Sequence, residues 1–228
     1  MRLDAYLVET SHFKSRGRAK QAILKGYVKV NGNIVRKPAK DVSTDDEIDV
    51  AGGMDRPVGY FKLKGIQEHT GVIKEGDMVL DLGSSAGGFL TFASGIAKTV
   101  RGIEFSKDFR SELGKVSFEN KNVSVIFGDV FKIPLNELSP EKVDVILSDL
   151  TLEPSDSLKA LERVLPLLKD GGRLLQVIKI KDRENRKPIL GQIESMGLTI
   201  IDVLESKKEE IYIIASKVGI DGEQEHNE

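Results

Sequence analysis

VLDLGSSAGGFL, from Val79 to Leu90, is the stretch that decides the fold of this chain. Its apolar start, which ends at Asp81-Leu82, predicts a buried strand, and the small residues Gly83 to Gly88 cannot extend that strand. Apolar residues then recur at helical spacing from Phe89 to Ala97 and predict a helix. A glycine turn between a strand and a helix lets a ligand approach bare backbone, and open α/β sheets bind nucleotides at such turns.

The glycine spacing indicates which nucleotide is bound. A dinucleotide fold needs G-x-G-x-x-G, but Ser85 occupies the second glycine position and the pattern is D-x-G-x-x-x-G-G. This pattern resembles motif I of the class I S-adenosylmethionine (SAM) methyltransferases, and the run is most similar to the FtsJ and TlyA ribose methyltransferases. The alternative is a glycine turn that binds nothing. The resemblance implies that SAM binds at Asp81, Gly83, Ser84, Ser85, Ala86, Gly87, Gly88 and Phe89.

Length and composition bound the other possibilities. With 228 residues the chain has room for one full-sized domain and a small one. It has no run of about 18 apolar residues and no leader-like N-terminus, so we expect a soluble, cytoplasmic protein. The chain has no Cys, and its three His show no ligand spacing, so neither a disulfide nor a metal site is expected.

Charge is distributed unevenly along the chain. Residues 1–40 contain ten Lys or Arg and two Asp or Glu, a net charge of +8, although the whole chain carries −2. A small basic segment on an acidic body suggests a nucleic-acid contact that is confined mostly to the N-terminus.

Residues 1–50 read as a small α+β domain. A helix is expected from Arg2 to Glu9, and Ser15 is a plausible N-cap for a second helix that ends at Gly26. A hairpin on an Asn-Gly turn and a closing strand, Glu47 to Val50, follow. The expected core is Leu3, Leu7, Ala19, Ile23, Val28, Val30 and Ile48.

Basic side chains around the second helix cannot join that core. Their charges could meet a phosphate backbone, although most such charge runs are simply solvated helix faces. The segments RLDAYLVE, SRGRAKQAILKGYVKVNG and DEIDV together resemble the S4-like (alpha-L) RNA-binding module, which also stands at the front of TlyA proteins. The candidate RNA-binding residues are Arg2, Lys14, Arg16, Arg18, Lys20 and Lys25.

The chain beyond residue 50 divides into a linker, a large domain and a tail. Residues 51–59 are rich in glycine and are expected to be a linker. Residues 60–217 would form the methyltransferase domain. The polar, acidic tail at 218–228 is expected to be disordered.

Two later strands end in candidate cofactor ligands. The strand Thr99 to Glu104 ends in a carboxylate, 21 residues beyond Gly83, which can accept both hydroxyls of an adenosine ribose. Phe105 beside it could lie against the adenine. After the strand Val123 to Phe127, the resemblance places an acceptor for the adenine amino group at Asp129, with Val130 next to it.

Four positions match catalytic residues of the FtsJ and TlyA families. The YFKL segment is similar to the Phe-Lys-Leu segment of FtsJ enzymes and places that family's first catalytic lysine at Lys62. The LSD segment places a catalytic aspartate at Asp149, which is also a candidate cofactor ligand. Lys179 stands at the interval after the Gly-Gly pair at which TlyA proteins have a lysine. Glu210 matches the glutamate of the family's Glu-Val-Tyr-Ile-Val-Ala.

The chain departs from both families near two of these residues. After Asp149 it has LTLEP where FtsJ proteins have Met-Ala-Pro-Asn, which leaves the substrate contacts of that loop uncertain. After Lys179 it has IKD in place of Pro-Gln-Phe-Glu, and FtsJ proteins have their lysine two residues earlier, at Val177. Lys179 is therefore the expected catalytic lysine and Lys181 the second choice.

The remaining pattern completes the fold class. A helix is expected from Ser155 to Leu168, with a strand from Arg173 to Lys179 after the Gly-Gly pair. A helix from Lys187 to Met196 and two terminal strands follow. We expect a Rossmann-like α/β class I methyltransferase fold, whose mostly parallel seven-stranded sheet ends in an antiparallel strand.

Methyl transfer to a ribose hydroxyl needs a base, because the hydroxyl is a poor nucleophile near neutral pH. We expect Lys179 to be that base, since Lys62 beside it disfavours a second ammonium and lowers its pKa from the ordinary value of about 10.4. Asp149 and Glu210 would orient the two amines and the hydroxyl.

The sequence thus predicts a SAM-dependent enzyme that methylates ribose 2′-hydroxyls of RNA, most consistent with ribosomal RNA or a ribosomal subunit as the partner. One alternative is a non-catalytic RNA-binding or ribosome-assembly factor that keeps the fold, which the altered segments favour. Another is a base-methylating enzyme, although the Asn/Asp-Pro-Pro-aromatic sequence of amino-group methylases is absent. A third alternative is membrane lysis, but no amphipathic membrane helix or spanning segment in the sequence supports it. The sequence is silent on oligomeric state.

Overall fold

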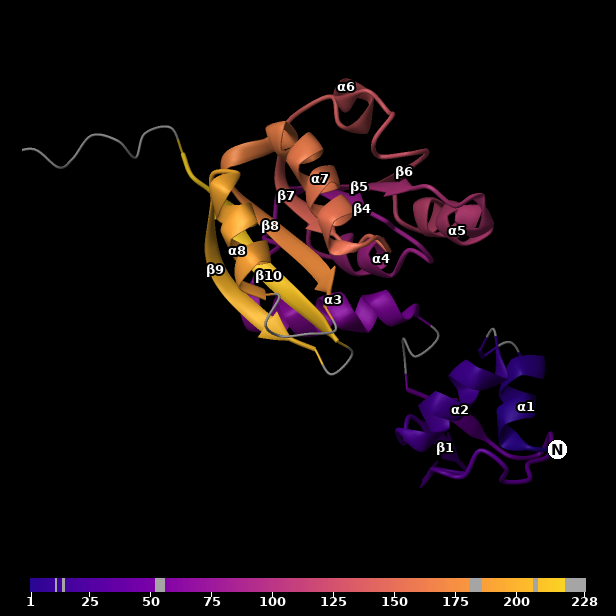
Figure 1. The fold of residues 1–228 in the computed structure, drawn as a ribbon. Helices are drawn as coiled ribbons and strands as arrows, with labels where there is room; N and C mark the ends of the chain where they lie inside the picture. Colours follow the sequence, from indigo (N-terminus) through magenta and orange to yellow (C-terminus); the bar gives the residue numbers. More distant parts are fainter. Residues whose placement is uncertain (11, 14, 52–55, 181–185, 207–208, 220–228) are drawn as a thin grey trace, which may run out of the picture. The chain divides into compact units, whose positions relative to one another are not determined.

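The computed structural model describes residues 1–10, 12–13, 15–51, 56–180, 186–206 and 209–219. The chain divides into two compact units, Met1–Arg56 and Pro57–Glu228 (Figure 1). Lys14, Lys181, residues 52–55 of the expected linker and residues 220–228 of the expected tail lie outside the described residues.

The N-terminal unit is two helices on a small antiparallel sheet. Helices α1 (Leu3–Glu9) and α2 (Arg16–Leu24) precede a sheet of order β2-β1-β3. Its strands are β1 (Val28–Val30), β2 (Asn33–Val35) and β3 (Ile48–Val50). The Ser15 hydroxyl accepts from the Arg18 amide at 3.4 Å, as expected of an N-cap. Asn31 and Gly32 have φ of 51° and 76°, the left-handed pair that a tight hairpin requires.

The core of this unit contains every residue that the sequence pattern predicts. Six of the seven are buried and Ile48 is partly buried. Phe13 and Val42 also belong to this core, but they lie outside regular elements, where periodicity gives no signal.

The second unit is built on a seven-stranded sheet of order β6-β5-β4-β7-β8-β10-β9. Strand β10 pairs antiparallel with both neighbours, and the other neighbouring pairs are parallel. This confirms the predicted fold class. The strands are β4 (Met78–Leu82), β5 (Thr99–Glu104), β6 (Val123–Phe127), β7 (Val143–Ser148), β8 (Leu168–Lys179), β9 (Leu198–Glu205) and β10 (Glu210–Lys217).

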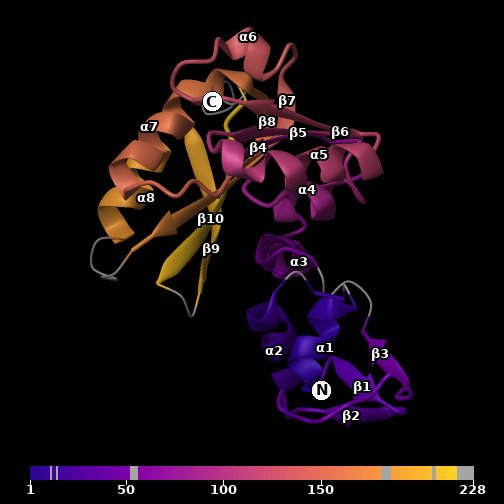
Figure 2. The same ribbon diagram turned by 90° about the vertical axis from the view of Figure 1, so that its right-hand side faces the viewer.

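Helices cover both faces of the sheet (Figure 2). On one face lie α3 (Val58–Thr70), α4 (Gly88–Ala93) and α5 (Arg110–Glu119), and on the other lie α7 (Pro154–Val164) and α8 (Arg186–Ser195). Each face has its own buried apolar cluster, so the strands are apolar on both sides. The short helix α6 (Leu135–Leu138) lies between β6 and β7 along the chain. No described helix is long and apolar enough to cross a membrane.

The largest differences from the prediction are the end of one helix and the start of the strand after it. The helix expected to reach Leu168 ends at Val164, a 3-10 turn follows over Leu165–Leu167, and β8 already begins at Leu168. Pro166 has no amide hydrogen, so regular helical pairing cannot continue through it. The glycine pair therefore lies inside the strand, where Gly171 has a φ of 70° and the pairing with β7 shifts register.

Candidate active site

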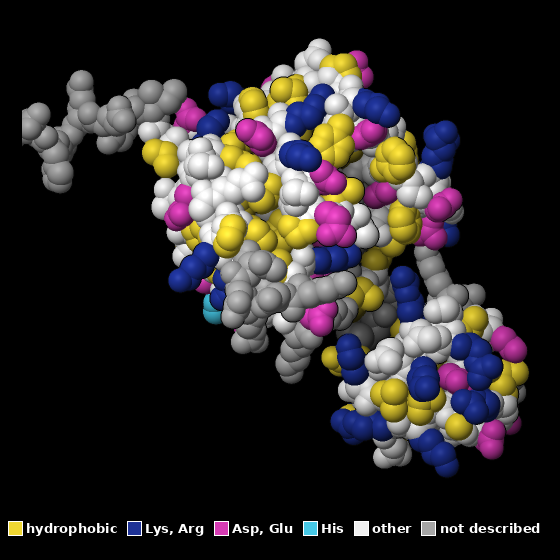
Figure 3. Space-filling model, in the orientation of Figure 1, with side chains coloured by type: hydrophobic (Ala, Val, Ile, Leu, Met, Phe, Trp, Pro, Cys, Tyr) yellow, Lys and Arg dark blue, Asp and Glu magenta, His cyan; other side chains and the backbone are white. Residues whose placement is uncertain are grey.

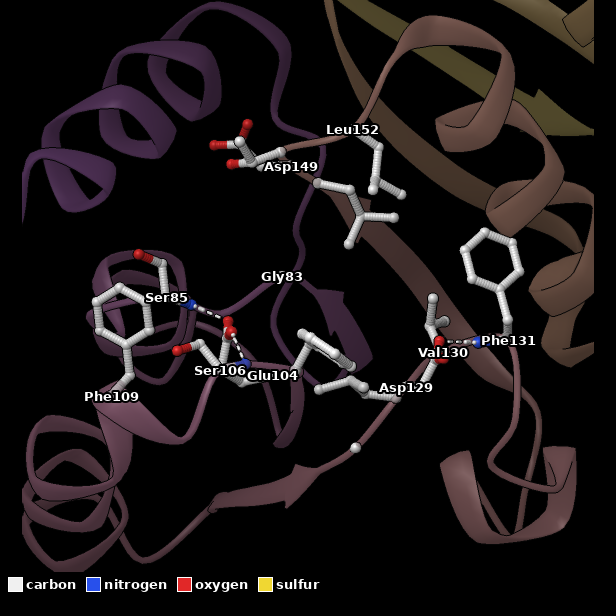
Figure 4. Close-up of a pocket in the computed structure, with 15 residues that line it drawn as sticks. Gly83, Ser85, Glu104, Ser106, Phe109, Asp129, Val130, Phe131, Asp149 and Leu152 are labelled. Atoms are coloured by element: carbon white, nitrogen blue, oxygen red, sulfur yellow. Dashed lines mark hydrogen bonds between the residues drawn. The ribbon is translucent and has the colours of Figure 1, made fainter.

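A cavity of about 530 Å³ opens where β4, β5, β6 and β7 end (Figure 4). The carboxyl ends of parallel strands meet at this edge, which is where open α/β sheets bind ligands. Seven of the predicted cofactor residues line the cavity: Gly83, Ser85, Glu104, Phe105, Asp129, Val130 and Asp149.

The glycine turn forms one side of this cavity. Gly83 has a φ of 83°, and a Cβ there would come 3.0 Å from the Asp149 carbonyl oxygen. The Ser85 amide donates to Oε2 of Glu104 at 2.7 Å, which ties the turn after β4 to the end of β5. Gly83 thus lets the turn approach the Asp149 segment closely, and Glu104 holds the turn there.

The other predicted residues of the turn are not part of the cavity lining. Asp81 is fully buried and accepts from the Ser84 hydroxyl at 2.7 Å. Burial raises the pKa of Asp81 to about 7. Gly88 and Phe89 are buried at the start of α4, Gly87 is its left-handed N-cap, and Ala86 is half-buried. These residues do not line the cavity, and their packing supports the turn.

Glu104 presents an anchored carboxylate to the cavity. Its Oε2 accepts from the Ser85 amide and its Oε1 from the Ser106 amide, each at 2.7 Å. Each carboxylate oxygen has two lone pairs, so Glu104 can accept further hydrogen bonds from a ligand. Phe105 follows it and is 75% exposed, so its ring is available to an aromatic ligand.

A second group of side chains gathers at the Asp149 side of the cavity. Nζ of Lys62 lies 2.8 Å from Oδ2 of Asp149 and 3.1 Å from Oε2 of Glu210. Lys62 comes from α3, Asp149 follows β7 and Glu210 begins β10, so residues far apart in the chain converge here. Burial lowers the pKa of Lys62, but the two carboxylates outweigh burial and raise this pKa above its ordinary value. Lys62 is therefore a fixed cation.

Strand register places Lys179 next to one member of this cluster, Glu210. It ends β8 directly opposite Glu210 in the antiparallel pair, and opposed residues project to the same face of a sheet. Its side chain is exposed.

Several site residues were missed in the sequence. Tyr212 lies one alternation from Glu210 on β10; its hydroxyl donates to Oε2 of Glu210 at 3.3 Å, and its ring centre lies 5.5 Å from Nζ of Lys62. The strand period places Tyr212 on the same face as Glu210, so the signal was present in the sequence. No such period applies to the cavity-lining residues Ser106, Phe131 and Leu152, which lie in loops, or to Phe109, which ends a short 3-10 turn.

The N-terminal unit exposes basic side chains, and Figure 3 shows them gathered on the face in view. Arg2 and Arg16 both bind Asp4, through Nε to Oδ1 at 3.0 Å and Nη2 to Oδ2 at 3.1 Å. Hydrogen bonds from Arg2, joined by Arg16 and opposed by burial, lower the pKa of Asp4 to about 2. Lys20 and Lys25 are exposed, and Arg18 is half-buried.

Among the described residues, no group of three or more His, Asp or Glu side chains is arranged to hold a metal ion.

Comparison with known families gives two matches. Residues 1–48 match the S4 domain, and residues 56–188 match the FtsJ-like methyltransferase family. The predicted order, an S4-like module followed by an FtsJ-like domain, is confirmed.

Individual relatives share parts of this chain. It is 38% identical over 91 residues to "Putative rRNA methyltransferase YqxC" of Bacillus subtilis strain 168, which covers 39% of this chain and 32% of that protein. It is 28% identical over 164 residues to "Hemolysin A" of Brachyspira hyodysenteriae, which covers 61% of this chain and 67% of that protein. The chain therefore matches about a third of the Bacillus protein's length.

A solved structure extends the comparison. Fibrillarin of Aeropyrum pernix, in complex with natively bound S-adenosyl-L-methionine, is 25% identical with a TM-score of 0.57. The match covers 69% of this chain and 75% of that one.

Proposed function

This chain belongs to the FtsJ-like methyltransferase family, and we propose that it transfers a methyl group from SAM to a ribose 2′-hydroxyl of RNA. The observation that carries the proposal is the convergence of Lys62, Asp149 and Glu210, with Lys179 in register beside them. Asp149 also lines the cavity, so the charged cluster adjoins the space in which a methyl donor would lie.

The cavity residues fit SAM. The cavity volume of about 530 Å³ is within the range of cofactor pockets. Gly83 and Ser85 would face the methionine part, Glu104 would accept from the ribose hydroxyls, and Asp129 would accept from the adenine amino group. Phe105 and Val130 would contact the purine. When bound, SAM would supply an activated methyl group on a positively charged sulfur.

The lysines would have different tasks. Lys62 is paired with two carboxylates and stays protonated, so it cannot take a proton near neutral pH. Lys179 is the second lysine of the site and lies opposite Glu210 in the strand pairing. Lys179 would then take the proton of the ribose hydroxyl as the new bond forms. Asp149 and Glu210 would hold Lys62 and orient the hydroxyl.

The RNA would be held by the basic N-terminal unit. Its match to the S4 domain and its exposed Arg and Lys side chains support contact with phosphates. The name of the Bacillus relative points to ribosomal RNA, so a ribosomal subunit is the first substrate to test.

The experiment compares Lys179→Ala with wild type, using labelled methyl-SAM and ribosomal subunits. We expect the variant to bind SAM with unchanged affinity and to lose methyl transfer by at least about 100-fold, the scale of general-base catalysis. Lys64→Ala is the control, because Lys64 lies on α3 and pairs with Glu68, outside the cluster. Undiminished transfer by Lys179→Ala would remove Lys179 from the base role. No transfer by wild type to any ribosomal particle would favour the non-catalytic RNA-binding alternative.

A further inference from the structure

Arg163 lies on α7, 33 residues beyond Val130, yet its guanidinium reaches the wall of the cavity. Nη1 donates to the Val130 carbonyl at 2.7 Å and Nη2 to the Ile133 carbonyl at 2.6 Å. These two carbonyls flank Phe131, which lines the cavity beside Asp129 (Figure 4). A planar guanidinium that binds two carbonyls fixes the orientation of a segment as well as its position.

The geometry of Asp129 depends on the same segment. Its carbonyl accepts from the amides of Lys132 and Ile133, at 2.9 and 3.0 Å. Its Oδ1 accepts from the Phe131 amide at 2.9 Å. The other carboxylate oxygen, Oδ2, lies 3.4 Å from Nζ of the exposed Lys132. Its direction therefore follows the segment of residues 130–133, whose backbone Arg163 holds.

Helix α7 gives Arg163 a fixed base. Leu158, Leu161 and Val164 of this helix are buried against the sheet, with at most 1% exposure. The helix begins directly after the segment of Leu150 and Leu152, which lines another wall of the cavity. Helix α7 is thus connected to two walls of the cavity. It is covalently continuous with the wall of Leu150 and Leu152, and Arg163 binds it to the wall of residues 130–133.

We propose that Arg163 is a positioning residue for the purine end of the cofactor. By holding residues 130–133 it aims the Asp129 carboxylate at the 6-amino group of the adenine. This inference rests on the proposed function, because it assumes that the cavity takes an adenosine compound. Arg163 itself touches neither the cofactor nor the reacting atoms.

The test uses two ligands that differ at one group of the purine. S-adenosylhomocysteine carries the 6-amino group, and S-inosylhomocysteine carries an oxo group instead. Calorimetric titration of the full chain gives the Kd for each ligand. We expect Arg163→Met to weaken the adenosine compound about tenfold and the inosine compound less than about threefold, because a misdirected Asp129 loses one specific hydrogen bond. The kcat at saturating SAM should stay within about twofold, so that KM changes and kcat does not.

Two further variants separate positioning from general loss of structure. Arg163→Lys keeps the charge but cannot bind both carbonyls in one plane, so its preference for S-adenosylhomocysteine over S-inosylhomocysteine should be intermediate. If Arg163→Met does not fold, Arg163→Lys provides the test. Arg101→Met is the matched control, because Arg101 also donates to two carbonyls, those of Glu137 and Leu138 at 3.3 and 3.5 Å, outside the cavity. Its Kd values should equal those of wild type.

Equal weakening of both ligands, or an unchanged Kd for S-adenosylhomocysteine, would overturn the assignment of Arg163 while leaving the proposed function intact. A wild-type chain that binds neither ligand would instead refute the proposed function, and the inference would fall with it.

Discussion

Asp4 is a buried carboxylate that two arginines of the N-terminal unit share. It is 4% exposed, while the side chains of Arg2 and Arg16 are 51% and 57% exposed. Each guanidinium therefore keeps donors free toward solvent while Asp4 fixes its direction. A fixed pair of guanidiniums suits the phosphate groups of RNA.

We predict that Asp4→Asn weakens RNA binding, about threefold to tenfold, although it adds one positive charge to the unit. Positioning and net charge predict opposite signs, because charge alone would tighten binding. RNA affinity at fixed salt, measured by fluorescence anisotropy, distinguishes them.

Glu9→Gln is the control for this prediction. Glu9 ends α1, is exposed, and its substitution changes the net charge equally. Glu9→Gln should leave RNA affinity unchanged or raise it slightly. Tighter binding by Asp4→Asn would show that Asp4 acts only through its charge.

Asp81 makes stability depend on pH. Its pKa is raised in the folded chain to about 7, from 3.8, so the folded state binds this proton more tightly than the unfolded state. The associated stability is fully present below about pH 4 and is lost as pH rises through 7. Between pH 5 and pH 8, the free energy of unfolding of wild type should therefore fall by about 3 kcal/mol more than that of Asp81→Asn. Urea unfolding at both pH values measures this difference.

Asp144→Asn is the control for Asp81. Burial opposes ionisation of Asp144, but hydrogen bonds from Lys169 and the Met78 amide outweigh burial and lower its pKa. Because the pKa of Asp144 is lowered, its carboxylate stays ionised at both pH values, so Asp144→Asn should keep the wild-type change in stability between pH 5 and pH 8. An Asp81→Asn variant with that same change would refute the prediction.

Site residues could be predicted from the sequence where they lie in a recognisable motif, and not where their role depends on loop conformation. Lys62, Asp149 and Glu210 could be found in the sequence because each lies in a short motif on or next to a regular element. Arg163 and Phe131 could not, since their roles depend on loop backbone that no periodic pattern encodes.

At the scale of elements, the contact between α3 and α4 places Lys62. A Cβ at Gly88 would lie 2.5 Å from the Tyr60 amide nitrogen and 2.9 Å from Gly59. The first turn of α3 therefore lies against the start of α4, and Lys62 begins the second turn of α3.

We predict that Gly88→Ala displaces α3 and with it Lys62, because the contact is with backbone that cannot rotate away. The cost in folding free energy should be about 1–3 kcal/mol, with a loss of methyl transfer of more than about tenfold. Thermal unfolding and the transfer assay measure the two effects.

Gly65→Ala serves as the comparison. Gly65 also lies on α3, but no atom is within 4 Å of its added Cβ. It should gain up to about 1 kcal/mol in stability, the difference in helix propensity, and keep full activity. Equal activity of the two variants would show that the α3–α4 contact does not position Lys62.

The strands Thr99–Glu104 and Val123–Phe127 have the predicted bounds. The first run ends in a carboxylate and the second ends before a glycine, so both ends are marked in the sequence. The prediction that helix α7 continues to Leu168, just before the Gly-Gly pair, is wrong, because Pro166 lies earlier and interrupts amide pairing first.

At the scale of the whole molecule, the sheet order gathers the site. Strands β4, β7, β8 and β10 are consecutive neighbours in the sheet, although β4 and β10 lie far apart in the chain. The antiparallel β10 begins at the edge where β7 and β8 end, which brings Glu210 to Asp149 and Lys179. This convergence was predictable because motif order implies the fold, whereas its distances required coordinates.

The central claim is that this convergence transfers methyl groups to ribose. The most direct measurement is mass spectrometry of nucleosides from ribosomal RNA of cells that lack the protein, complemented with wild type or with Lys179→Ala. We predict that one 2′-O-methylnucleoside disappears in the deletion, returns with wild type and stays absent with Lys179→Ala. An unchanged set of ribose methylations, or the loss of a base-methylated nucleoside instead, would contradict the claim.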